Sequence, residues 1–357
     1  MAEILAGKGK SKYKIHITAK SLPKSKINRQ IGLNNKVLIV TDSGIPKTYI
    51  KELRKIIKNK SVNVITLGQG EKSKSFSSYQ KILNKLLDLK FDRSDKLIAL
   101  GGGVVGDITG FCAATYLRGI EYIQIPTSLL AQVDSSVGGK TAINAKQGKN
   151  LIGSFYNPKF VLISTHFLKT LPENELKSGF AEVIKHALIS DYKFWNKIKN
   201  QSFEDYNFQK IINFSINHKL NIVEKDPKEN GSRKKLNFGH TIGHALESHF
   251  LSLNKTIFHG FAVAQGMAIE AFISYKLNHI SKEKYTEIKE FIFSIYQPIA
   301  INKNDIKTLV GFMSNDKKNE NTKINFTLLD DIGSAVYDKY ISVEDIDNLM
   351  HDFYNYD

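Results

Sequence analysis

The segment LIALGGGVVGDITGFCAATYL, residues 97–117, decides how the first half of the chain folds. An apolar run that ends in three glycines predicts a buried strand, and the residues that follow predict a helix. Glycine lets the backbone approach a ligand closely, and the first amides of a helix are free to bind phosphate. The spacing differs from the GxGxxG fingerprint of dinucleotide-binding proteins. The turn therefore favours nucleotide binding, while a plain tight turn stays open as an alternative.

Strands and helices alternate on either side of this segment. The apolar patterns predict strands at 36–44, 61–70, 121–128 and 159–165 and helices at 46–59 and 75–91. Such alternation indicates a parallel sheet with helices on both faces. From about Leu171 the pattern becomes helical with few strand signals. We therefore expect a Rossmann-like α/β nucleotide-binding domain over residues 1–170 and an all-α domain over residues 171–357.

The composition limits the class of protein. A net charge of +16 over 357 residues could indicate a nucleic-acid or anionic-membrane partner. The lysines are spread along the chain, so a compositional bias explains them better, and we expect neither partner. The single cysteine, Cys112, excludes an internal disulfide and lies in an apolar run that predicts a buried thiol. No signal peptide or run of about 20 apolar residues is visible, so a cytoplasmic protein is expected.

The central segment PTSLLAQVDSSVGGKTAINAKQGKNLIGSFYNP carries Asp134, Lys140, Lys149 and Asn150 among small residues. Glycines precede both lysines, and a flexible backbone beside lysine suits a phosphate or carboxylate ligand. A solvated loop is the alternative, although part of the segment is too apolar to be fully exposed. The residues alone favour neither an anion-binding segment nor a solvated loop over the other.

The segment KKLNFGHTIGHALESHF places His240, His244 and Glu247 on one face of a predicted helix. A further histidine, His259, follows, and Glu182 in GFAEVIKHAL could supply an oxygen ligand. Histidine nitrogens with a carboxylate oxygen are typical zinc ligands. Structural histidines and a surface ion pair at Glu182 are the alternatives, and the residues alone do not decide between them.

Six stretches of the chain, taken in order, resemble the 3-dehydroquinate synthase family of sugar phosphate cyclases. They are GGGVVGDITGF, YLRGIEYIQIPTSLLAQVDSSVGGKTAIN, GKNLIGSFYNP, AEVIKHALI, RKKLNFGHTIGHALE and HGFAVAQGM. The resemblance covers most of the chain. It implies an N-terminal nucleotide-binding α/β domain and a C-terminal helical domain, with the site between them.

The resemblance also implies the reaction. The substrate would be 3-deoxy-D-arabino-heptulosonate 7-phosphate, and the products 3-dehydroquinate and phosphate, in the shikimate pathway. NAD would oxidise the substrate transiently and be regenerated, with Zn²⁺ or Co²⁺ as the metal. A homodimer is implied, in which Arg118 reaches the site of the partner subunit. A cation that ends a helix is the alternative for Arg118.

The resemblance assigns residues to three groups by motif. The metal ligands would be Glu182, His240 and His259. The cofactor contacts would be Asp42, Glu71, Lys74, Gly102, Gly103, Asp107, Thr127, Ser128, Asp134, Lys140, Lys149, Phe167, Thr170, Leu171 and Glu175. The catalytic and substrate-binding residues would be Arg118, Asp134, Lys140, Asn150, Lys185, Lys219, Glu229, Arg233, Asn237 and His244.

Two details remain open within the resemblance. Gly44 stands where the family often has Asn, which puts one nicotinamide-ribose contact in doubt. Either Lys317 or Lys318 would close the substrate pocket.

Three other functions compete with this one. A cyclase that forms a deoxy-inosose or a valiolone would lack the residues that bind a substrate carboxylate, whereas Lys219, Arg233, Asn237 and His244 follow the dehydroquinate synthase pattern. A metal-dependent polyol dehydrogenase would need fewer anion-binding residues and would release NADH. A nucleic-acid-binding protein is supported by the net charge alone.

Overall fold

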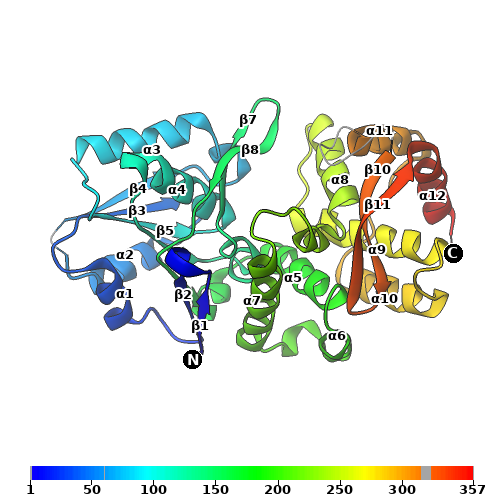
Figure 1. Ribbon diagram of the computed structural model, residues 1–357, viewed down its shortest axis with the longest axis horizontal. Helices are drawn as coiled ribbons and strands as arrows, with labels where there is room; N and C mark the ends of the chain where they lie inside the picture. Colours follow the sequence, from blue (N-terminus) through cyan, green and yellow to red (C-terminus); the bar gives the residue numbers. More distant parts are fainter. Residues whose placement is uncertain (1, 60, 315–322, 357) are drawn as a thin grey trace. The chain divides into compact units, whose positions relative to one another are not determined.

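A computed structural model describes residues 2–59, 61–314 and 323–356 of the chain. The backbone groups into two compact units (Figure 1). The first unit comprises Met1–Pro172 and Phe208–Leu220, and the second comprises Glu173–Asn207 and Asn221–Asp357. Helix α7 (Phe208–Lys225) begins in the first unit and ends in the second. The predicted domain boundary at residue 170 stays a prediction.

The first unit is built on a seven-stranded sheet with the order β1-β2-β9-β6-β5-β3-β4. The strands are β1 (Ala2–Ala6), β2 (Tyr13–Thr18), β3 (Val37–Asp42), β4 (Val62–Leu67), β5 (Lys96–Gly101), β6 (Tyr122–Pro126) and β9 (Phe160–Ser164). Strand β1 is antiparallel to β2, and every other pairing in this sheet is parallel. The predicted parallel sheet is confirmed, and the strand pair at its N-terminal edge was not anticipated.

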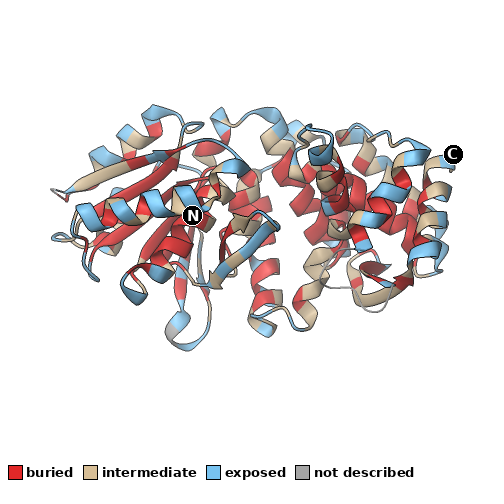
Figure 2. Ribbon diagram, turned by 90° about the horizontal axis from the view of Figure 1, so that it is seen from above, coloured by how far each residue is buried: buried red, intermediate tan, exposed pale blue. Residues whose placement is uncertain are grey.

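Both faces of this sheet are covered, because successive side chains of a strand point to opposite faces. Leu38 and Val40 of β3 pack into one apolar core, and Val37 and Ile39 pack into the other. The helices of this unit are α1 (Lys24–Ile31), α2 (Lys47–Ile56), α3 (Phe76–Asp88) and α4 (Gly103–Thr115). Figure 2 shows the buried residues gathered in the interior of each unit and the exposed ones on the outer helices and loops. Cys112 is fully buried, as predicted.

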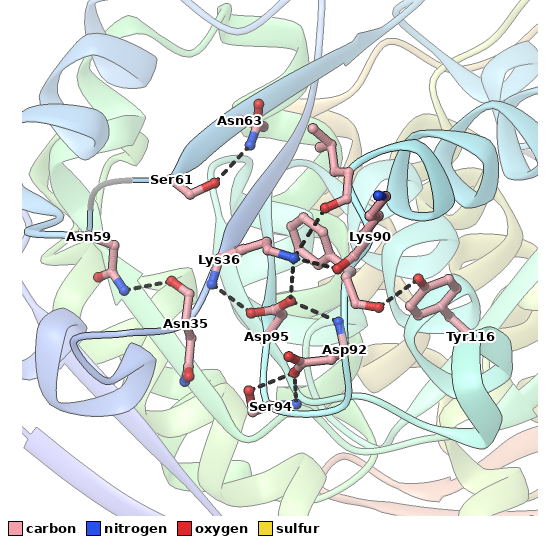
Figure 3. A network of polar contacts seen from close by, with 12 residues as sticks. Asn35, Lys36, Asn59, Ser61, Asn63, Lys90, Asp92, Ser94, Asp95 and Tyr116 are labelled. Atoms are coloured by element: carbon pink, nitrogen blue, oxygen red, sulfur yellow. Dashed lines mark hydrogen bonds and ion pairs between the residues drawn. The ribbon is translucent and has the colours of Figure 1, made fainter.

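A polar network fixes the sheet where strands β3 and β5 begin (Figure 3). Asp95 accepts hydrogen bonds from the backbone amides of Lys36 at 2.6 Å and Asp92 at 2.8 Å. Asp92 in turn accepts from the amide and hydroxyl of Ser94. Asp95 directly precedes β5, and its carboxylate binds the amide of Lys36, which directly precedes β3. This hydrogen bond therefore helps to set the register of the two strands. It lies at the opposite ends of these strands from the glycine turn.

The second unit is mainly helical. Its helices are α5 (Glu173–Leu188), α6 (Tyr192–Lys199), α8 (His240–Ser252), α9 (His259–Lys276), α10 (Lys282–Ile295), α11 (Lys303–Ser314) and α12 (Val343–Asn355). Helix α9 touches its neighbours backbone to backbone. A Cβ atom added to Gly260 would lie 1.9 Å from the carbonyl oxygen of Ser178 in α5, and one added to Gly266 would lie 2.1 Å from that of Gly239 before α8. Only glycine allows these close contacts.

The expectation of an all-α second half is wrong at one place. Strands β10 (Lys323–Asp331) and β11 (Ser334–Ser342) form an antiparallel hairpin. Its turn contains Gly333, at φ 92°, which suits a residue without a side chain. The hairpin is joined to helix α8, because the hydroxyl of Thr241 donates to the carbonyl oxygen of Asn325 at 3.2 Å.

A second hairpin occupies the central segment of the first unit. Strands β7 (Lys140–Ala145) and β8 (Gly148–Phe155) pair with each other in a separate two-stranded sheet. The segment is therefore neither a plain solvated loop nor part of the main sheet. Side chains of β7 such as Ile143 reach the apolar core beneath helices α3 and α4.

Candidate metal and cofactor sites

Three helices of the second unit bring Glu182, His240 and His259 together. Glu182 lies on α5, His240 begins α8 and His259 begins α9. The Nε2 atoms of His240 and His259 lie 3.5 and 3.6 Å from Oε1 of Glu182. One potential ligand atom from each residue lies within 4.8 Å of the others. Residues that are far apart in the sequence thus meet at one point.

These separations fit a shared metal ion better than they fit hydrogen bonds. Ligand atoms about 2.1 Å from a tetrahedral zinc stand roughly 3.4 Å apart, whereas good hydrogen bonds to oxygen are about 2.9 Å. Oε1 of Glu182 is buried and makes no hydrogen bond to any of the residues that the structure describes. Two nitrogens and one oxygen that converge on a buried point are a donor set suited to Zn²⁺ or Co²⁺.

The other ring nitrogen of each histidine faces a second oxygen. Nδ1 of His240 lies 3.1 Å from the carbonyl oxygen of Phe238, and Nδ1 of His259 lies 3.4 Å from Oε2 of Glu247. A proton held on Nδ1 by such an acceptor leaves the lone pair of Nε2 free for a metal. In both rings this acceptor favours the tautomer that a metal requires.

Charged neighbours keep Glu182 ionised. Burial alone would raise its pKa, but Lys185 and His240 outweigh burial and hold the pKa of Glu182 well below its usual range. Lys185 lies one turn along α5, forms an ion pair with Glu182 and is almost fully buried. The alternative interpretation of Glu182, a surface ion pair, is therefore wrong, because the side chains of Glu182 and Lys185 both lie in the interior.

The surroundings of the two histidines shift their pKa values in opposite directions. Burial and Lys185 lower the pKa of His240. Burial also disfavours the charged form of His259, but the carboxylates of Glu182 and Glu247 outweigh this and raise the pKa of His259 to about 10. A metal cation at the shared point would take the place of that proton.

Glu270 is a supporting residue that the sequence did not reveal. It is fully buried in α9, and its carboxylate accepts hydrogen bonds from the backbone amides of Gly239 at 2.5 Å and Ile242 at 3.3 Å. Such a carboxylate satisfies free amides at the start of α8, where His240 stands. A lone glutamate in the apolar stretch FAVAQGMAIEAFIS was the available signal.

A loop before α8 holds three of the predicted substrate residues. Asp226 accepts hydrogen bonds from the amides of Asn230, Gly231 and Arg233 at 2.6–3.1 Å, which shapes the loop. Arg233 is buried and donates to the carbonyl oxygen of Pro227. Within the same loop, Asn237 donates to Glu229 at 3.0 Å. Asp226 was not singled out from the sequence.

The glycine turn of the first unit lies as predicted, between β5 and α4. Gly102 precedes the helix, and a Cβ atom added there would lie 3.4 Å from Oγ of Ser128. A Cβ atom added to Gly103 would lie 3.0 Å from Oγ of Ser135. The amide of Thr127 donates to the carbonyl oxygen of Gly101 at 3.0 Å. Two predicted cofactor contacts, Thr127 and Ser128, thus adjoin the turn.

A polar cluster beside α4 contains four more predicted residues. The ammonium group of Lys74 bonds to the carboxylate of Asp107 and to the side-chain oxygen of Asn150. Glu71 joins through Asn144, whose amide group donates to Glu71 at 2.7 Å and whose oxygen accepts from the amide of Asn150. Burial raises the pKa of Asp107, and Lys74 opposes this shift. Asn144 was not among the predicted residues.

Asp134 and Lys219 form a second polar pair in the first unit. Lys219 of α7 lies 2.8 Å from Oδ1 of Asp134 and donates to the backbone oxygen of that residue at 2.7 Å. Asp134 lies in a π-helical turn, Ala131–Ser135. Turns of this kind occur often at functional sites.

The remaining predicted cofactor residues are dispersed. Asp42 ends β3, and burial raises its pKa. Phe167 and Thr170 instead pack against Tyr49 of α2, by ring contact and by a 2.8 Å hydrogen bond respectively. Leu171 follows this turn, and Glu175 lies on α5 in the second unit. At Gly44, a Cβ atom would meet the side chain of Gln69 at 2.6 Å, so the asparagine usual in the family would require Gln69 to move.

Seven of the predicted residues are exposed, namely Glu71, Arg118, Lys140, Lys149, Asn150, Thr170 and His244. Helix α4 ends at Thr115, and Arg118 follows in a separate short turn at φ 64°. Arg118 is therefore the last residue of the short 3-10 helix Tyr116–Arg118, and it does not end α4. Lys317 and Lys318 lie outside the described residues.

Comparison with known proteins settles the family. Residues 64–178 match the family described as 3-dehydroquinate synthase N-terminal, and residues 179–319 match 3-dehydroquinate synthase C-terminal. The chain belongs to the 3-dehydroquinate synthase family. The 3-dehydroquinate synthase of Campylobacter concisus (strain 13826) is 41% identical over 344 residues, which cover 96% of each chain.

Solved structures show that the fold is shared with other sugar phosphate cyclases. A 2-deoxy-scyllo-inosose synthase complexed with carbaglucose-6-phosphate, NAD⁺ and Co²⁺ has a TM-score of 0.85 at 24% identity and covers 98% of this chain and 99% of its own. The 2-epi-5-epi-valiolone synthase of Streptomyces hygroscopicus subsp. jinggangensis 5008, with NAD⁺ and Zn²⁺ bound, has a TM-score of 0.85 at 20% identity, with 97% of each chain covered. At these identities the likeness concerns the fold.

Proposed function

We propose that this member of the 3-dehydroquinate synthase family converts 3-deoxy-D-arabino-heptulosonate 7-phosphate to 3-dehydroquinate and phosphate, with NAD and a divalent metal, in the shikimate pathway. The observation that carries this proposal is 41% identity to a 3-dehydroquinate synthase over 96% of both chains. The convergence of Glu182, His240 and His259 supports it independently. Among the described residues no helix is both long and apolar enough to span a bilayer.

The cofactors supply the chemistry that protein side chains lack: bound NAD⁺ accepts and returns a hydride, and a bound divalent metal polarises hydroxyl groups. The residues of the chain bind the cofactors and the substrate and orient them. The amides at Gly102 and Gly103 suit the pyrophosphate of NAD, because free amides at a helix start attract anions. Glu182, His240 and His259 would hold the metal.

The cations of the chain stabilise the negative charge of the substrate. Lys219 is held at a fixed position by Asp134, and Arg233 is held by the carbonyl oxygen of Pro227. Lys185, held beside Glu182, supplies a further cation. Because these cations are positioned by other residues before substrate binds, little reorganisation accompanies the reaction.

The direct test combines the protein with the heptulosonate phosphate, catalytic NAD⁺ and Zn²⁺. Phosphate and 3-dehydroquinate should form in equal amounts, without accumulation of NADH. Net NADH would instead indicate a polyol dehydrogenase. Turnover of glucose 6-phosphate, which has no carboxylate, in place of the heptulosonate phosphate would indicate an inosose-forming cyclase.

We also propose a cytoplasmic homodimer in which Arg118 contributes to the partner's site. The exposed position of Arg118, beside the exposed Leu117, is compatible with a role at an interface. Mixing Arg118→Ala with Lys185→Ala subunits tests this, because one site of each mixed dimer would be intact. Verified mixed dimers that stay inactive would count against a role across the interface.

A further inference from the structure

Glu247 lies beside the proposed metal ligands, although neither the family resemblance nor the comparisons give it a role. It is on α8, almost two turns after His240, and its side chain is 13% exposed. Its Oε2 atom is 3.4 Å from Nδ1 of His259, while Nε2 of the same ring faces Glu182. The ring of His259 therefore lies between two carboxylates.

We propose that Glu247 is a positioning residue that holds the ring of His259 in the orientation and tautomer that bind the metal. The inference rests on the proposed metal site. Glu247 accepts a hydrogen bond from the N–H group at Nδ1, so the lone pair of Nε2 is directed to the point shared with Glu182 and His240. Metal-binding histidines commonly use a carboxylate partner in this way.

The position of His259 explains why it needs such a partner. His259 is the first residue of α9, and the side chain of the preceding residue, Phe258, makes no capping hydrogen bond to the start of this helix. Its ring is 29% exposed, compared with 13% for the ring of His240. His240 is held locally, because the backbone oxygen of Phe238 lies two residues before it. Glu247 supplies the corresponding acceptor to His259 from another helix, and so couples α8 to the start of α9.

A different arrangement of the same residues must be separated from this one. Atoms of His244, Glu247 and His259 also lie within 4.8 Å of one another and could hold an ion themselves. The two arrangements differ in the importance of Glu247. A direct ligand contributes to the coordination number, whereas a positioning residue changes affinity and geometry and leaves one ion bound through Glu182.

The experiment measures metal binding to the full-length protein without substrate. Metal-free protein is titrated with Co²⁺, followed by its visible absorption bands, and Zn²⁺ affinity is measured by competition with a chelating dye. Glu247→Ala should bind one ion about 10–100-fold more weakly than wild type, with an altered Co²⁺ spectrum. Glu247→Gln keeps an acceptor oxygen and should restore most of the affinity and the spectrum. Glu290→Ala, which removes an exposed glutamate from α10, is the matched control and should bind as wild type.

The outcomes distinguish this inference from the proposed function. Wild-type affinity and spectrum in Glu247→Ala would overturn it. So would a loss as large as that of Glu182→Ala in both Glu247 variants, since this would make Glu247 a ligand. Wild-type affinity in Glu182→Ala would instead overturn the metal site itself. Melting of the metal-free variants shows whether they fold, and Glu247→Gln keeps the comparison valid if Glu247→Ala does not.

Discussion

The glycine turn of the first unit and the histidine cluster of the second are built from different materials. At the turn, the backbone around Gly102 and Gly103 offers amides, and the nearby side chains are small. In the cluster, Glu182, His240 and His259 offer side-chain atoms from three helices. A backbone site depends on empty space beside one turn. A side-chain site depends on the mutual packing of distant elements, and its charges are buried together.

This difference predicts that substitutions in the cluster affect folding and binding together, while a substitution at the turn can affect binding alone.

The largest effect is expected for Glu182→Ala. Metal affinity should fall by more than the roughly 100-fold that a change in a supporting residue costs. Stability should also fall by roughly 3–5 kcal/mol, because Lys185 loses its buried carboxylate partner. Metal content after dialysis against a chelator and urea unfolding of the metal-free protein measure the two effects. Stoichiometric zinc in the dialysed variant would contradict the assignment.

A glycine inside the second unit should behave as part of the packing. In Gly266→Ala the new Cβ atom would lie 2.1 Å from the carbonyl oxygen of Gly239, so α8 and α9 must separate. Overpacking of this kind costs about 1–3 kcal/mol, and the shift of α8 should also weaken metal binding at His240. Urea unfolding and Zn²⁺ competition measure both quantities. A stable variant with unchanged metal affinity would show that the helix contact does not position the cluster.

The same substitution at the glycine turn should spare the fold. In Gly102→Ala the nearest side-chain atom to the new Cβ, Oγ of Ser128, is 3.4 Å away, and the backbone at φ −72° accepts alanine. Stability should stay within about 0.5 kcal/mol of wild type. Affinity for NAD should fall about tenfold, equivalent to about 1.4 kcal/mol, because the methyl group occupies the approach of the cofactor. Calorimetric titration with NAD⁺ tests this, and unchanged affinity would make the turn merely structural.

The smallest effect is electrostatic and belongs to the hairpin that supports the cluster. Lys234 and Asp338 pair at 2.8 Å, with each side chain 30% exposed. The hydrogen bond to Asp338 raises the pKa of Lys234. Partial burial would raise the pKa of Asp338, but Lys234 and Asn325 outweigh it and lower that pKa.

The signs of these shifts define a pH window. The contribution of Asp338 is present above about pH 4, its unfolded pKa, and is lost as pH falls through its lowered folded pKa. That of Lys234 is present below about pH 10 and is lost as pH rises through its raised folded pKa. The pair should therefore add up to about 1 kcal/mol at neutral pH. Wild type and Asp338→Asn should differ in urea stability at pH 7, and the difference should be smaller at pH 3, because the pair is lost as pH falls through the lowered pKa of Asp338. An equal difference at both pH values would show that charge is not the cause.

The same contrast explains what the sequence could predict. Short apolar runs such as 97–100 identify the strands, and glycines mark the turn, because both signals are local. Distant partners leave no local signal, so residues alone could not decide whether Glu182, His240 and His259 meet, and the family resemblance supplied that expectation. Glu270 and Asp226 were missed for the same reason, since each satisfies backbone amides that only the fold brings near. The hairpin β10–β11 was not predicted, because the residues after about 171 show a mainly helical pattern with few strand signals.

The glycine contacts of α9 also have a thermodynamic consequence. Because Gly260 and Gly266 hold the backbones of α5, α9 and the start of α8 in contact, the atoms that would bind the metal are in place before the ion arrives. Metal uptake should then order almost no chain and bury little apolar surface. Calorimetry should accordingly record a heat-capacity change near zero. In this respect the protein would differ from small zinc domains, in which the energy of metal binding is the energy of folding.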